Sequence, residues 1–317
     1  MPNPIDLPQW KTLKQLAADF QNVTLRDLFA SDAARAEKMT LDACGIHLDY
    51  SKNRVNKAAM RALVKIAEAA NLKSEIEKMR EAGRLLALVH EEMAKHIKPG
   101  ISTMELNNIG DRMIRSFGCI PSFLYYDGYP ASICISVNDK VVHGIPSKDE
   151  ILKEGDIVSL DAGLIYKGYH SDAARTYGVG KISPEAADLI KVTEESFYEG
   201  IKLAKAGNHL YDISAAIEDY VVAHGYSCVK DLVGHGIGTE MHEDPQIPNF
   251  HQKRRGMKLQ PGMTLAIEPM VNMGDWRVCI LEDDWTIVTE DGSLASHYEN
   301  TILITEGEPE ILSLIKH

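Results

Sequence analysis

The chain has 317 residues, 44% hydrophobic and 25% charged, which is typical of a globular protein with one large domain or two smaller ones. A formal net charge of −12 at pH 7 argues against a nucleic-acid surface, which is usually basic. We interpret the short basic run Lys253-Arg254-Arg255 as a solvated loop, with a phosphate or RNA contact as the alternative. No stretch approaches the roughly 20 apolar residues of a membrane span. We therefore expect neither DNA nor a membrane as partner.

The cysteines and the N-terminus indicate a reducing compartment. The N-terminal residues lack the apolar stretch of a signal peptide. The five cysteines are scattered and form no CxxC pair, so neither a disulfide framework nor a structural zinc site is indicated. We therefore expect a cytoplasmic protein. The cysteines are Cys44, Cys119, Cys134, Cys228 and Cys279.

The first part of the chain is mainly helical and amphipathic, from Trp10 to Leu72. It is interrupted by GIHLDYSKNR at residues 45–54, whose start is typical of a short strand. The Ala, Met and Leu content of residues 57–70 predicts a helix there. No low-complexity linker follows, so the boundary with the next segment is marked only by its motifs.

Two capping boxes predict the next two helices. Ser74 and Glu77 can satisfy each other's backbone donors, which predicts a helix from Ser74 to about Ile97, ending before Pro99. A second box, Ser102-Thr103-Met104-Glu105, opens a helix that Gly118 closes.

After Gly118 the pattern changes to strands with glycine punctuation, at 132–138, 155–163 and 168–179. Helical stretches follow at 184–205 and 211–224. Strands return at 227–233, 262–268, 277–281, 285–289 and 295–304. The order helix, helix, strands thus occurs twice, which predicts two αβ halves in one α+β domain.

The segment DAGLIYKGYHSD places Asp161 and Asp172 on either side of a tight turn. With Tyr166 and Lys167 as the loop, the two acids become direct cross-strand partners on one face, about 5 Å apart at Cβ. Two carboxylates placed so repel each other unless a cation lies between them. A solvent-facing hairpin with two chance acids, or a bulge at Gly168 that breaks this register, is the alternative.

Two further acids lie where a strand is otherwise apolar. Glu268 follows the alternating strand GMTLAI and precedes Pro269, and Glu299 interrupts the β-branched strand SHYENTILIT. An unpaired buried acid is costly. Acids on separate strands therefore indicate a shared partner.

His235 in VGHGIGTEMHEDP is a candidate ligand whose flanking glycines would let the backbone approach a bound group closely. A structural histidine is the alternative. The GxGxG spacing also resembles a nucleotide loop, but no βαβ unit or ribose-binding acid accompanies it.

Five motifs in order resemble those of type I methionine aminopeptidases: VVHGIP (141–146), GYHSDAART (168–176), GHGIGTEMHEDP (234–245), GMTLAIEPM (262–270) and HYENT (297–301). The resemblance covers about residues 74–317. It implies the pita-bread fold of that family, two pseudo-symmetric αβ halves, and removal of the N-terminal methionine from nascent proteins with a small second residue. It also implies a monomer that acts near the ribosome.

The resemblance implies two divalent metal ions held by five residues. Asp161 would bind one metal, Asp172 and Glu299 would bridge the two, and His235 and Glu268 would bind the other. Four carboxylates and one imidazole suit Co²⁺, Mn²⁺, Fe²⁺ or Zn²⁺. A water between the ions would have its pKa lowered toward about 7, and Glu268 would shuttle its proton.

The resemblance also implies roles for His143, which would position the substrate amide or leaving nitrogen, and for His242, which would contact the peptide carbonyl or the oxyanion. Each is otherwise a hydrogen-bonded histidine that supports the site. The methionine pocket should be apolar and adaptable. Its residues would be Tyr126, Tyr129, Cys134, Met241 and Trp285.

The chain departs from the family pattern at three positions. Phe123 stands where many relatives have Cys or a small residue, and we do not place it in the pocket. Asp284 stands where many have Gly before the Trp, which can strain a turn or shift Trp285. Asn300 stands where many have His after the bridging Glu. None of these changes removes a metal ligand.

Residues 1–73 resemble the extreme N-terminus of glucose-6-phosphate isomerase, through LRDLFA and LDYSKNR. The catalytic residues of that family lie far downstream and are absent, so no isomerase activity is expected. We expect a chimera joined at about residues 72–74, with a mobile helical appendage. Its apolar residues would pack on the enzyme or stay partly exposed. They are Trp10, Leu13, Phe20, Leu28 and Phe29.

Two other functions remain open from the sequence. A proline dipeptidase or creatinase-like hydrolase would have the same fold, usually with a large N-terminal domain and a different pocket. A catalytically inactive pita-bread protein that only binds partners would tend to lose metal ligands, whereas this sequence keeps all five.

Overall fold

The computed structural model describes residues 8–19, 23–32, 34–43, 46–49, 56–69 and 72–315. The chain forms two compact units, Met1–Glu75 and Ile76–His317. The motifs predict a boundary after residue 73, and the first compact unit ends two residues later, at Glu75. In the described part of the chain, each helix is too short or too polar to span a membrane.

The first unit is mainly helical, with one small hairpin. Thr24 and Asp27 form a capping box at the start of its second helix, with the Asp27 amide donating to the Thr24 hydroxyl at 3.2 Å. The hairpin confirms the strand predicted after Gly45. The elements are α1 (Pro8–Asp19), α2 (Leu25–Ser31), α3 (Arg35–Lys38), β1 (Thr40–Ala43), β2 (Ile46–Asp49) and α4 (Lys57–Ala69).

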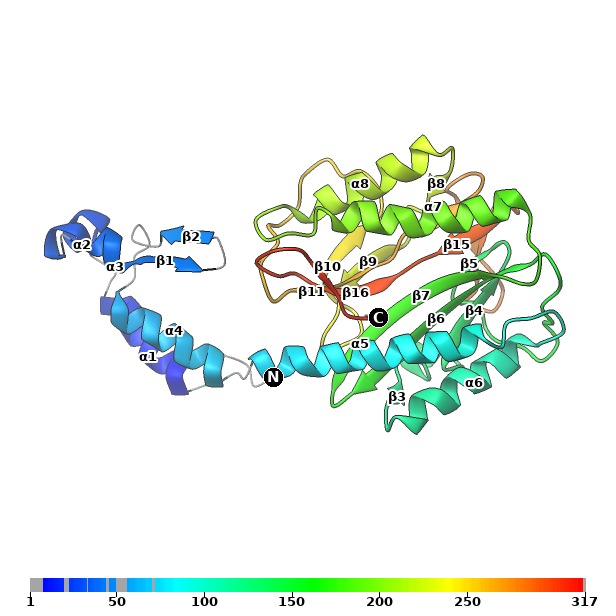
Figure 1. Ribbon diagram of the computed structural model, residues 1–317, viewed down its shortest axis with the longest axis horizontal. Helices are drawn as coiled ribbons and strands as arrows, with labels where there is room; N and C mark the ends of the chain where they lie inside the picture. The colour runs from blue at the N-terminus through cyan, green and yellow to red at the C-terminus, as the bar shows by residue number, and fades with distance from the viewer. Residues whose placement is uncertain are drawn as a thin grey trace. The chain divides into compact units, whose positions relative to one another are not determined.

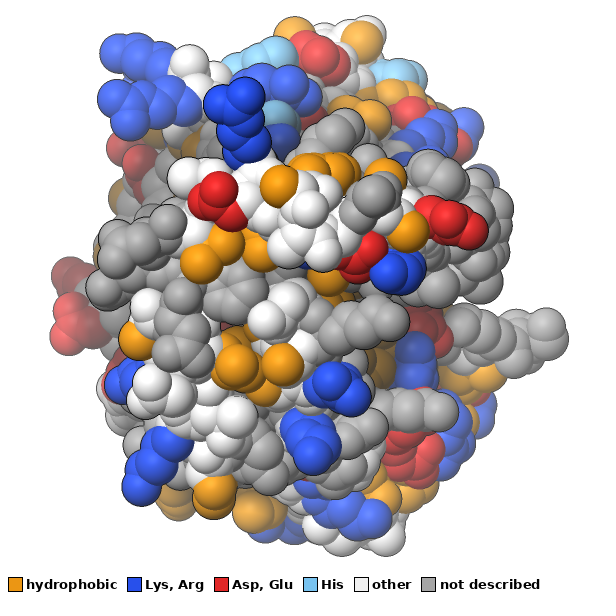
Figure 2. Space-filling model, turned by 90° about the vertical axis from the view of Figure 1, so that its left-hand side faces the viewer, with side chains coloured by type: hydrophobic (Ala, Val, Ile, Leu, Met, Phe, Trp, Pro, Cys, Tyr) orange, Lys and Arg blue, Asp and Glu red, His pale blue; other side chains and the backbone are white. Residues whose placement is uncertain are grey.

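The apolar side chains of this unit differ in exposure. Leu28 is buried, Trp10 and Leu13 are half-buried, and Phe29 is 36% exposed. Phe20 and residues 50–54 of the LDYSKNR motif lie outside the described residues. Figure 2 shows one face of the chain, on which described hydrophobic side chains are interspersed with charged ones.

The first half of the second unit packs two helices on a sheet. The long strand β6 pairs with β7 over its whole length, and successive parts of β6 also pair with β4 and β3. Leu86, Leu106 and Ile114 from the helices pack against Ile135 and Leu160 of the strands. The elements are α5 (Leu72–Ala94), α6 (Thr103–Ser116), β3 (Ile120–Pro121), β4 (Ile133–Val137), β6 (Ile157–Tyr166) and β7 (Tyr169–Gly178).

The second half repeats this plan, as the sequence predicts. Leu189, Phe197 and Ile217 of its two helices pack against Leu265 and Ile302 of a sheet with strand order β10-β9-β11-β16-β17. Figure 1 shows the long strands β6 and β7 and the strands β9, β11 and β16 between the helix pair α5, α6 and the pair α7, α8. The elements are α7 (Pro184–Ile201), α8 (Leu210–Ala223), β9 (Val233–Gly236), β10 (Glu243–Pro248), β11 (Thr264–Ile267), β16 (Asn300–Leu303) and β17 (Glu310–Ile311).

Two small sheets complete the unit, with orders β15-β12-β8 and β13-β14-β5. Their strands are β5 (Lys140–Val142), β8 (Ser227–Cys228), β12 (Met270–Asn272), β13 (Val278–Ile280), β14 (Ile287–Thr289) and β15 (Ala295–His297). The single strand predicted at 295–304 is therefore wrong. It is two strands, because β15 pairs with β12 while β16 pairs with β11, and the chain changes sheets at Tyr298 and Glu299.

One of the two predicted capping boxes is correct. Ser102 caps α6, its hydroxyl accepting from the Glu105 amide at 3.2 Å, and Gly118 follows the helix with φ +72°. The box at Ser74 is wrong, because α5 already begins at Leu72 and Ser74 lies inside its first turn. A capping residue needs a non-helical backbone, which Ser74 does not have.

Gly83 in α5 provides a test of this packing. A Cβ added there would lie 2.3 Å from the Leu312 carbonyl oxygen. Alanine gains about 1 kcal/mol of helix propensity, but backbone overpacking costs about 1–3 kcal/mol or more. We therefore expect Gly83→Ala to lower the free energy of unfolding in urea, with the transition at a lower urea concentration. Arg84→Ala, at an exposed position with a surface ion pair, should change it by less than about 0.5 kcal/mol. Equal stability of Gly83→Ala and wild type would contradict this packing.

Candidate metal centre and pocket

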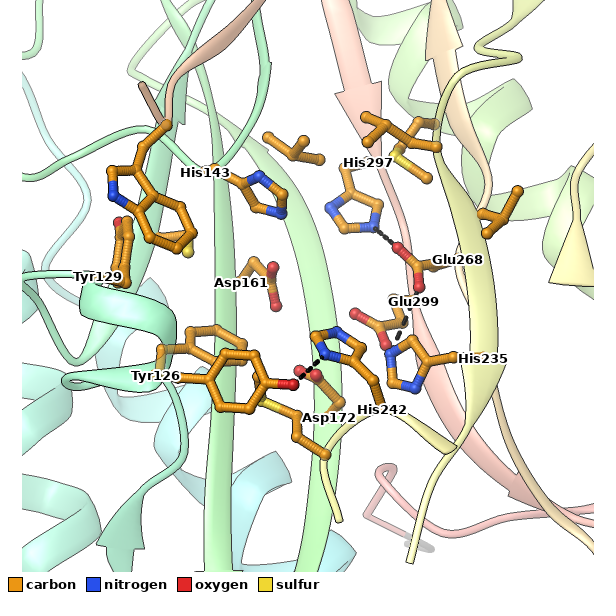
Figure 3. A pocket seen from close by; sticks show the side chains of 18 of the residues that line it. Tyr126, Tyr129, His143, Asp161, Asp172, His235, His242, Glu268, His297 and Glu299 are labelled. Atoms are coloured by element: carbon orange, nitrogen blue, oxygen red, sulfur yellow. Dashed lines mark hydrogen bonds and ion pairs between the residues drawn. The ribbon is translucent and has the colours of Figure 1, made fainter. Parts of the chain in front are cut away.

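Each half of the second unit contributes polar side chains to one common site. Asp161 on β6 and Asp172 on β7 come from the first half. His235 on β9, Glu268 directly after β11 and Glu299 directly before β16 come from the second. Figure 3 shows these side chains around a common space between the strands. The structure therefore brings together all five residues predicted as metal ligands.

The hairpin carries its acids in a different register from the predicted one. Lys167 and Gly168 form the two-residue turn, with φ +50° and +83°, and Tyr166 pairs with Tyr169. Positive φ at both turn residues is typical of a type I′ turn, which a glycine accommodates easily. Asp161 consequently faces Ala174, and Asp172 faces Gly163.

The predicted direct pairing of Asp161 and Asp172 is therefore wrong. Because directly facing residues share a side of the sheet, the two acids still lie on the same face, as diagonal neighbours. A shift of one residue in the turn moves each pairing by two positions, so the faces are preserved.

His235 presents one nitrogen to the acids. Its Nδ1 donates a hydrogen bond to the Gly236 carbonyl at 2.8 Å, which leaves the Nε2 lone pair free to act as a ligand. Nε2 lies 3.6 Å from Glu268 Oε1. Burial lowers the pKa of His235 to about 4, so the ring is neutral at pH 7.

The glycines beside His235 are required by the packing of the sheet. A Cβ on Gly234 would lie 2.5 Å from the Ala266 carbonyl oxygen, and one on Gly236 would lie 2.3 Å from that of Asp244. Both contacts are with backbone, so neither position tolerates a side chain. The glycines let neighbouring chain segments approach β9 closely and so fix where His235 stands.

Oxygens of three of the acids are buried without any hydrogen-bond partner among the described residues: Asp161 Oδ1, Asp172 Oδ1 and Glu299 Oε1. Burial raises the pKa of Asp172 to about 7. The pKa values of Asp161, Glu268 and Glu299 are also raised, first by burial and then by the neighbouring carboxylates. Carboxylates in this state lack a counter-charge.

The donor set fits a divalent cation. Asp172, His235 and Glu299 each offer one ligand atom, and these atoms all lie within 4.8 Å of one another. Asp161 and Glu268 add further oxygens beside them. Such oxygen-rich sites with one imidazole are typical of first-row divalent metals.

The acids form one end of a cavity of about 330 Å³. An apolar cluster of Phe123, Tyr129, Cys134 and Met241 forms its wall, with Tyr126 and Trp285 packed against it. All the side chains predicted for metal, catalytic or pocket roles line this one cavity. An apolar cavity that ends in a few polar groups is the usual form of a small-ligand site.

The two predicted catalytic histidines lie on the cavity wall. His242 Nδ1 hydrogen-bonds with the Tyr126 hydroxyl at 2.8 Å, and its ring lies 4.4 Å from that of His235. His143 has φ +58°, and Gly144 beside it is so close to β4 that a Cβ would lie 2.2 Å from the Ile135 carbonyl oxygen. Burial lowers the pKa of His143 to about 4. This histidine is therefore neutral at pH 7.

Several lining residues were not predicted, among them Phe123 and His297. Phe123 lies in the cavity wall and is 7% exposed, although a ring of this size suggested a position elsewhere. His297 is 1% exposed, and its Nε2 lies 3.8 Å from Glu268 Oε2. His297 opens the HYENT motif, so its position two residues before Glu299 was a signal that could have identified it.

Trp285 keeps its place despite Asp284. Asp284 has φ +61°, a conformation that favours glycine, so the expected strain of the turn is present. The Asp283 carboxylate accepts hydrogen bonds from the Trp285 amide at 2.9 Å and the Thr286 amide at 2.7 Å. The Trp285 ring accordingly packs on Tyr129, with ring centroids 5.1 Å apart.

The raised carboxyl pKa values predict how metal binding responds to pH. In the metal-free folded protein Asp172 stays protonated up to about pH 7, and a metal must displace that proton. We expect the affinity of the chelated protein for Mn²⁺ to rise with pH from about pH 6 through pH 7, by up to about tenfold per displaced proton for each pH unit. Calorimetric titrations in two buffers of different ionisation enthalpy would measure the protons released. An affinity independent of pH over this range would contradict the assigned protonation.

Comparison with known proteins agrees with this site. The model of metallopeptidase family M24 matches residues 77–306. A methionine aminopeptidase of Clostridium acetobutylicum is 54% identical over 241 residues, which are 76% of this chain and 96% of that protein. The crystal structure of a methionine aminopeptidase from Thermotoga maritima is 47% identical, with a TM-score of 0.75, and covers 76% of this chain and 97% of its own.

A solved Xaa-Pro dipeptidase from Bacillus anthracis is also similar, at 25% identity and a TM-score of 0.63, over 83% of this chain and 70% of its own. Both kinds of structure share the pita-bread arrangement of two αβ halves predicted from the sequence. The family match, the fold and the buried acids agree, and the chain belongs to metallopeptidase family M24.

Proposed function

We propose that this protein is a type I methionine aminopeptidase that removes the N-terminal methionine of peptides and nascent proteins. One observation carries the proposal: buried, unpaired carboxylate oxygens stand beside His235 at the end of an apolar cavity. The 54% identity to a methionine aminopeptidase over nearly the whole of that protein supports it.

We propose two divalent metals, Co²⁺, Mn²⁺, Fe²⁺ or Zn²⁺, in this centre. Asp161 would hold one, His235 and Glu268 the other, and Asp172 and Glu299 would be shared between them. The closeness of Asp172, Glu299 and His235 supports this division. When bound, such metals lower the pKa of water and polarise a carbonyl group.

Glu268 is the proposed proton carrier. It lies at the end of β11, next to His235 and His297, and burial raises the pKa of its carboxyl group. A raised pKa lets a carboxylate take a proton from the attacking water and return it to the leaving nitrogen near neutral pH. Its position at a strand end leaves the carboxylate open to the cavity.

His242 and His143 are the proposed substrate-binding histidines. The hydrogen bond between Tyr126 and His242 fixes the His242 ring beside that of His235, where it can contact the peptide carbonyl or the oxyanion. His143 is neutral and faces the same cavity, where it can bind the substrate amide or the leaving nitrogen.

The cavity wall supports specificity for methionine. Tyr129, Cys134, Met241 and Trp285, with Phe123, make an apolar wall without a fixed charge. The unbranched thioether side chain of methionine is flexible and apolar, so it can pack against such a wall. A small second residue would place the scissile bond beside the acids without crowding the two histidines.

The alternative within the family is a dipeptidase that cleaves before proline. The lower identity to the Xaa-Pro dipeptidase, 25% against 54%, favours the methionine substrate. A binding protein without activity is disfavoured, because all five ligand side chains are present and converge.

We also propose that the enzyme acts in the cytoplasm as a monomer, on nascent chains near the ribosome. The described cysteines, Cys119, Cys134, Cys228 and Cys279, are all free, which agrees with a reducing compartment.

For the N-terminal unit we propose an origin as the N-terminal fragment of a glucose-6-phosphate isomerase, fused to the enzyme and inactive by itself. The support is the LRDLFA and LDYSKNR motifs and the division of the chain near residue 75. A fragment removed from a larger domain lacks the partners that buried its apolar side chains.

The activity can be tested with the full chain. We expect chelated protein to regain release of Met from Met-Ala-Ser when one divalent metal is added. Glu268→Gln and Asp161→Asn keep the side-chain size but remove a charge, and we expect each to lower kcat by at least about 100-fold. Full activity in either variant would contradict the assigned centre. Faster cleavage of Ala-Pro than of Met-Ala-Ser would favour the dipeptidase.

The character of the N-terminal unit can be tested by amide hydrogen exchange of the same chain. We expect residues 8–69 to exchange faster than β6 and β7, because a fragment with exposed apolar side chains opens more easily. The helix α6 serves as an internal control for a stable helix. Equal protection in both units would refute a mobile appendage.

A further inference from the structure

Arg175 lies behind the candidate metal centre. It is on β7, three residues after Asp172, so its side chain points to the opposite face of the strand. Its guanidinium donates hydrogen bonds to the backbone carbonyls of Ala174 at 2.6 Å, Ser313 at 3.3 Å, and Glu299. It also donates to the side-chain oxygen of Asn300. One side chain thus joins β7, the segment around Glu299 and the end of the chain.

Asn300 and Ser313 complete this group. Asn300 is fully buried and Ser313 is 1% exposed. The Ser313 hydroxyl donates to Asn300 Oδ1 at 2.9 Å and accepts from the Thr301 amide at 3.1 Å. The Arg175 guanidinium and the Ser313 hydroxyl thus both donate to Asn300 Oδ1, while Asn300 Nδ2 has no partner among the described residues. Asn300 therefore acts here as an acceptor only.

Thr301 connects Asn300 and Ser313 to Asp172, the other acid that would be shared between the metals. The Thr301 hydroxyl accepts from the Asp172 amide at 2.9 Å and donates to the Asp172 carbonyl at 2.9 Å. The Leu312 amide donates to the Thr301 carbonyl at 2.9 Å. The terminal segment is thus bonded to Thr301, which in turn holds the backbone of Asp172.

The ring of Tyr298 holds the guanidinium from another side, with Arg175 Cζ 4.4 Å from its centroid. Tyr298 is 6% exposed and precedes Glu299 directly. A guanidinium is planar, permanently charged and carries five donors, so it can stack on a ring and bind several carbonyls at once. A lysine has the charge without this geometry.

We propose that Arg175, Asn300 and Ser313 are positioning residues that hold the backbones of Asp172 and Glu299 at the spacing a pair of shared metal ligands requires. The proposal rests on the proposed function as a metal-dependent enzyme. None of the three side chains touches the cavity. They act through the two acids, whose free oxygens would otherwise repel each other and move apart.

The experiment uses the full chain, stripped of metal, with three variants of the proposed positioning residues and one surface control. Arg175→Lys keeps the charge and loses the planar donors. Asn300→Leu keeps the volume and loses the acceptor, whereas Asn300→Asp keeps the acceptor and serves as the matched control. We measure the Kd for Mn²⁺ by calorimetry, the melting temperature without metal, and kcat and KM for Met-Ala-Ser.

We expect Arg175→Lys and Asn300→Leu to raise the Kd for Mn²⁺ by about 10-fold or more and to lower kcat, because supporting groups around metal ligands typically contribute this much. KM should stay within about twofold, since the pocket wall is unchanged. Asn300→Asp should retain a Kd within about threefold of wild type, because no hydrogen bond is lost. Arg115→Lys, which alters an exposed ion pair with Asp111 on α6, should leave the Kd unchanged.

A lower melting temperature with an unchanged Kd for Mn²⁺ would show a merely structural role and overturn the proposal. If Arg175→Lys does not fold, the comparison of Asn300→Leu with Asn300→Asp decides. Failure of the proposed function is a separate result, in which wild type binds no Mn²⁺ or releases no Met. If wild type binds Mn²⁺ and releases Met, but Arg175→Lys and Asn300→Leu bind Mn²⁺ with the same affinity as wild type, only the positioning role is contradicted.

Discussion

The gathering of four carboxylates around one neutral imidazole is the constraint on which the rest of the structure depends. Asp172 and Glu299 are buried, and Asp161 and Glu268 are half-buried. Desolvation raises the pKa of all four acids, and repulsion between carboxylates raises those of Asp161, Glu268 and Glu299 further. Such a group opposes folding unless protons or metals compensate it. The two apolar cores, one in each half, supply the packing that holds it together. The site is stable because the scaffold around it is.

The division into two halves explains how the acids meet. Each half places its acids on a strand or at a strand end, with two helices covering the far side of the sheet. Neither half alone contains all the candidate ligands, since β6 and β7 supply two acids and the ends of β11 and β16 supply the others. A metal bound between them would bind both halves and so resist their separation. Function and stability are linked at this junction.

The structure shows how the three residues that we expect to depart from the family pattern, Phe123, Asp284 and Asn300, are accommodated. Phe123 joins the apolar wall beside Tyr129 and Cys134. Asp284 adopts a left-handed conformation, while the Asp283 carboxylate keeps Trp285 in place. Asn300 accepts hydrogen bonds from Arg175 and Ser313 behind Glu299. Replacement of a residue next to a ligand is tolerated where its neighbours supply matching donors or acceptors.

The sequence by itself determined the features that depend on near neighbours: the cap at Ser102, the helices predicted at 184–205 and 211–224, the hairpin, and acids at the ends of apolar strands. Only the tertiary structure decided the register of that hairpin, because a one-residue shift of its turn leaves the local pattern unchanged. It also decided that Gly234 and Gly236 serve strand packing, that His297 faces Glu268, and that the chain changes sheets before Glu299. Each of these depends on atoms distant in sequence, whose approach no local periodicity encodes.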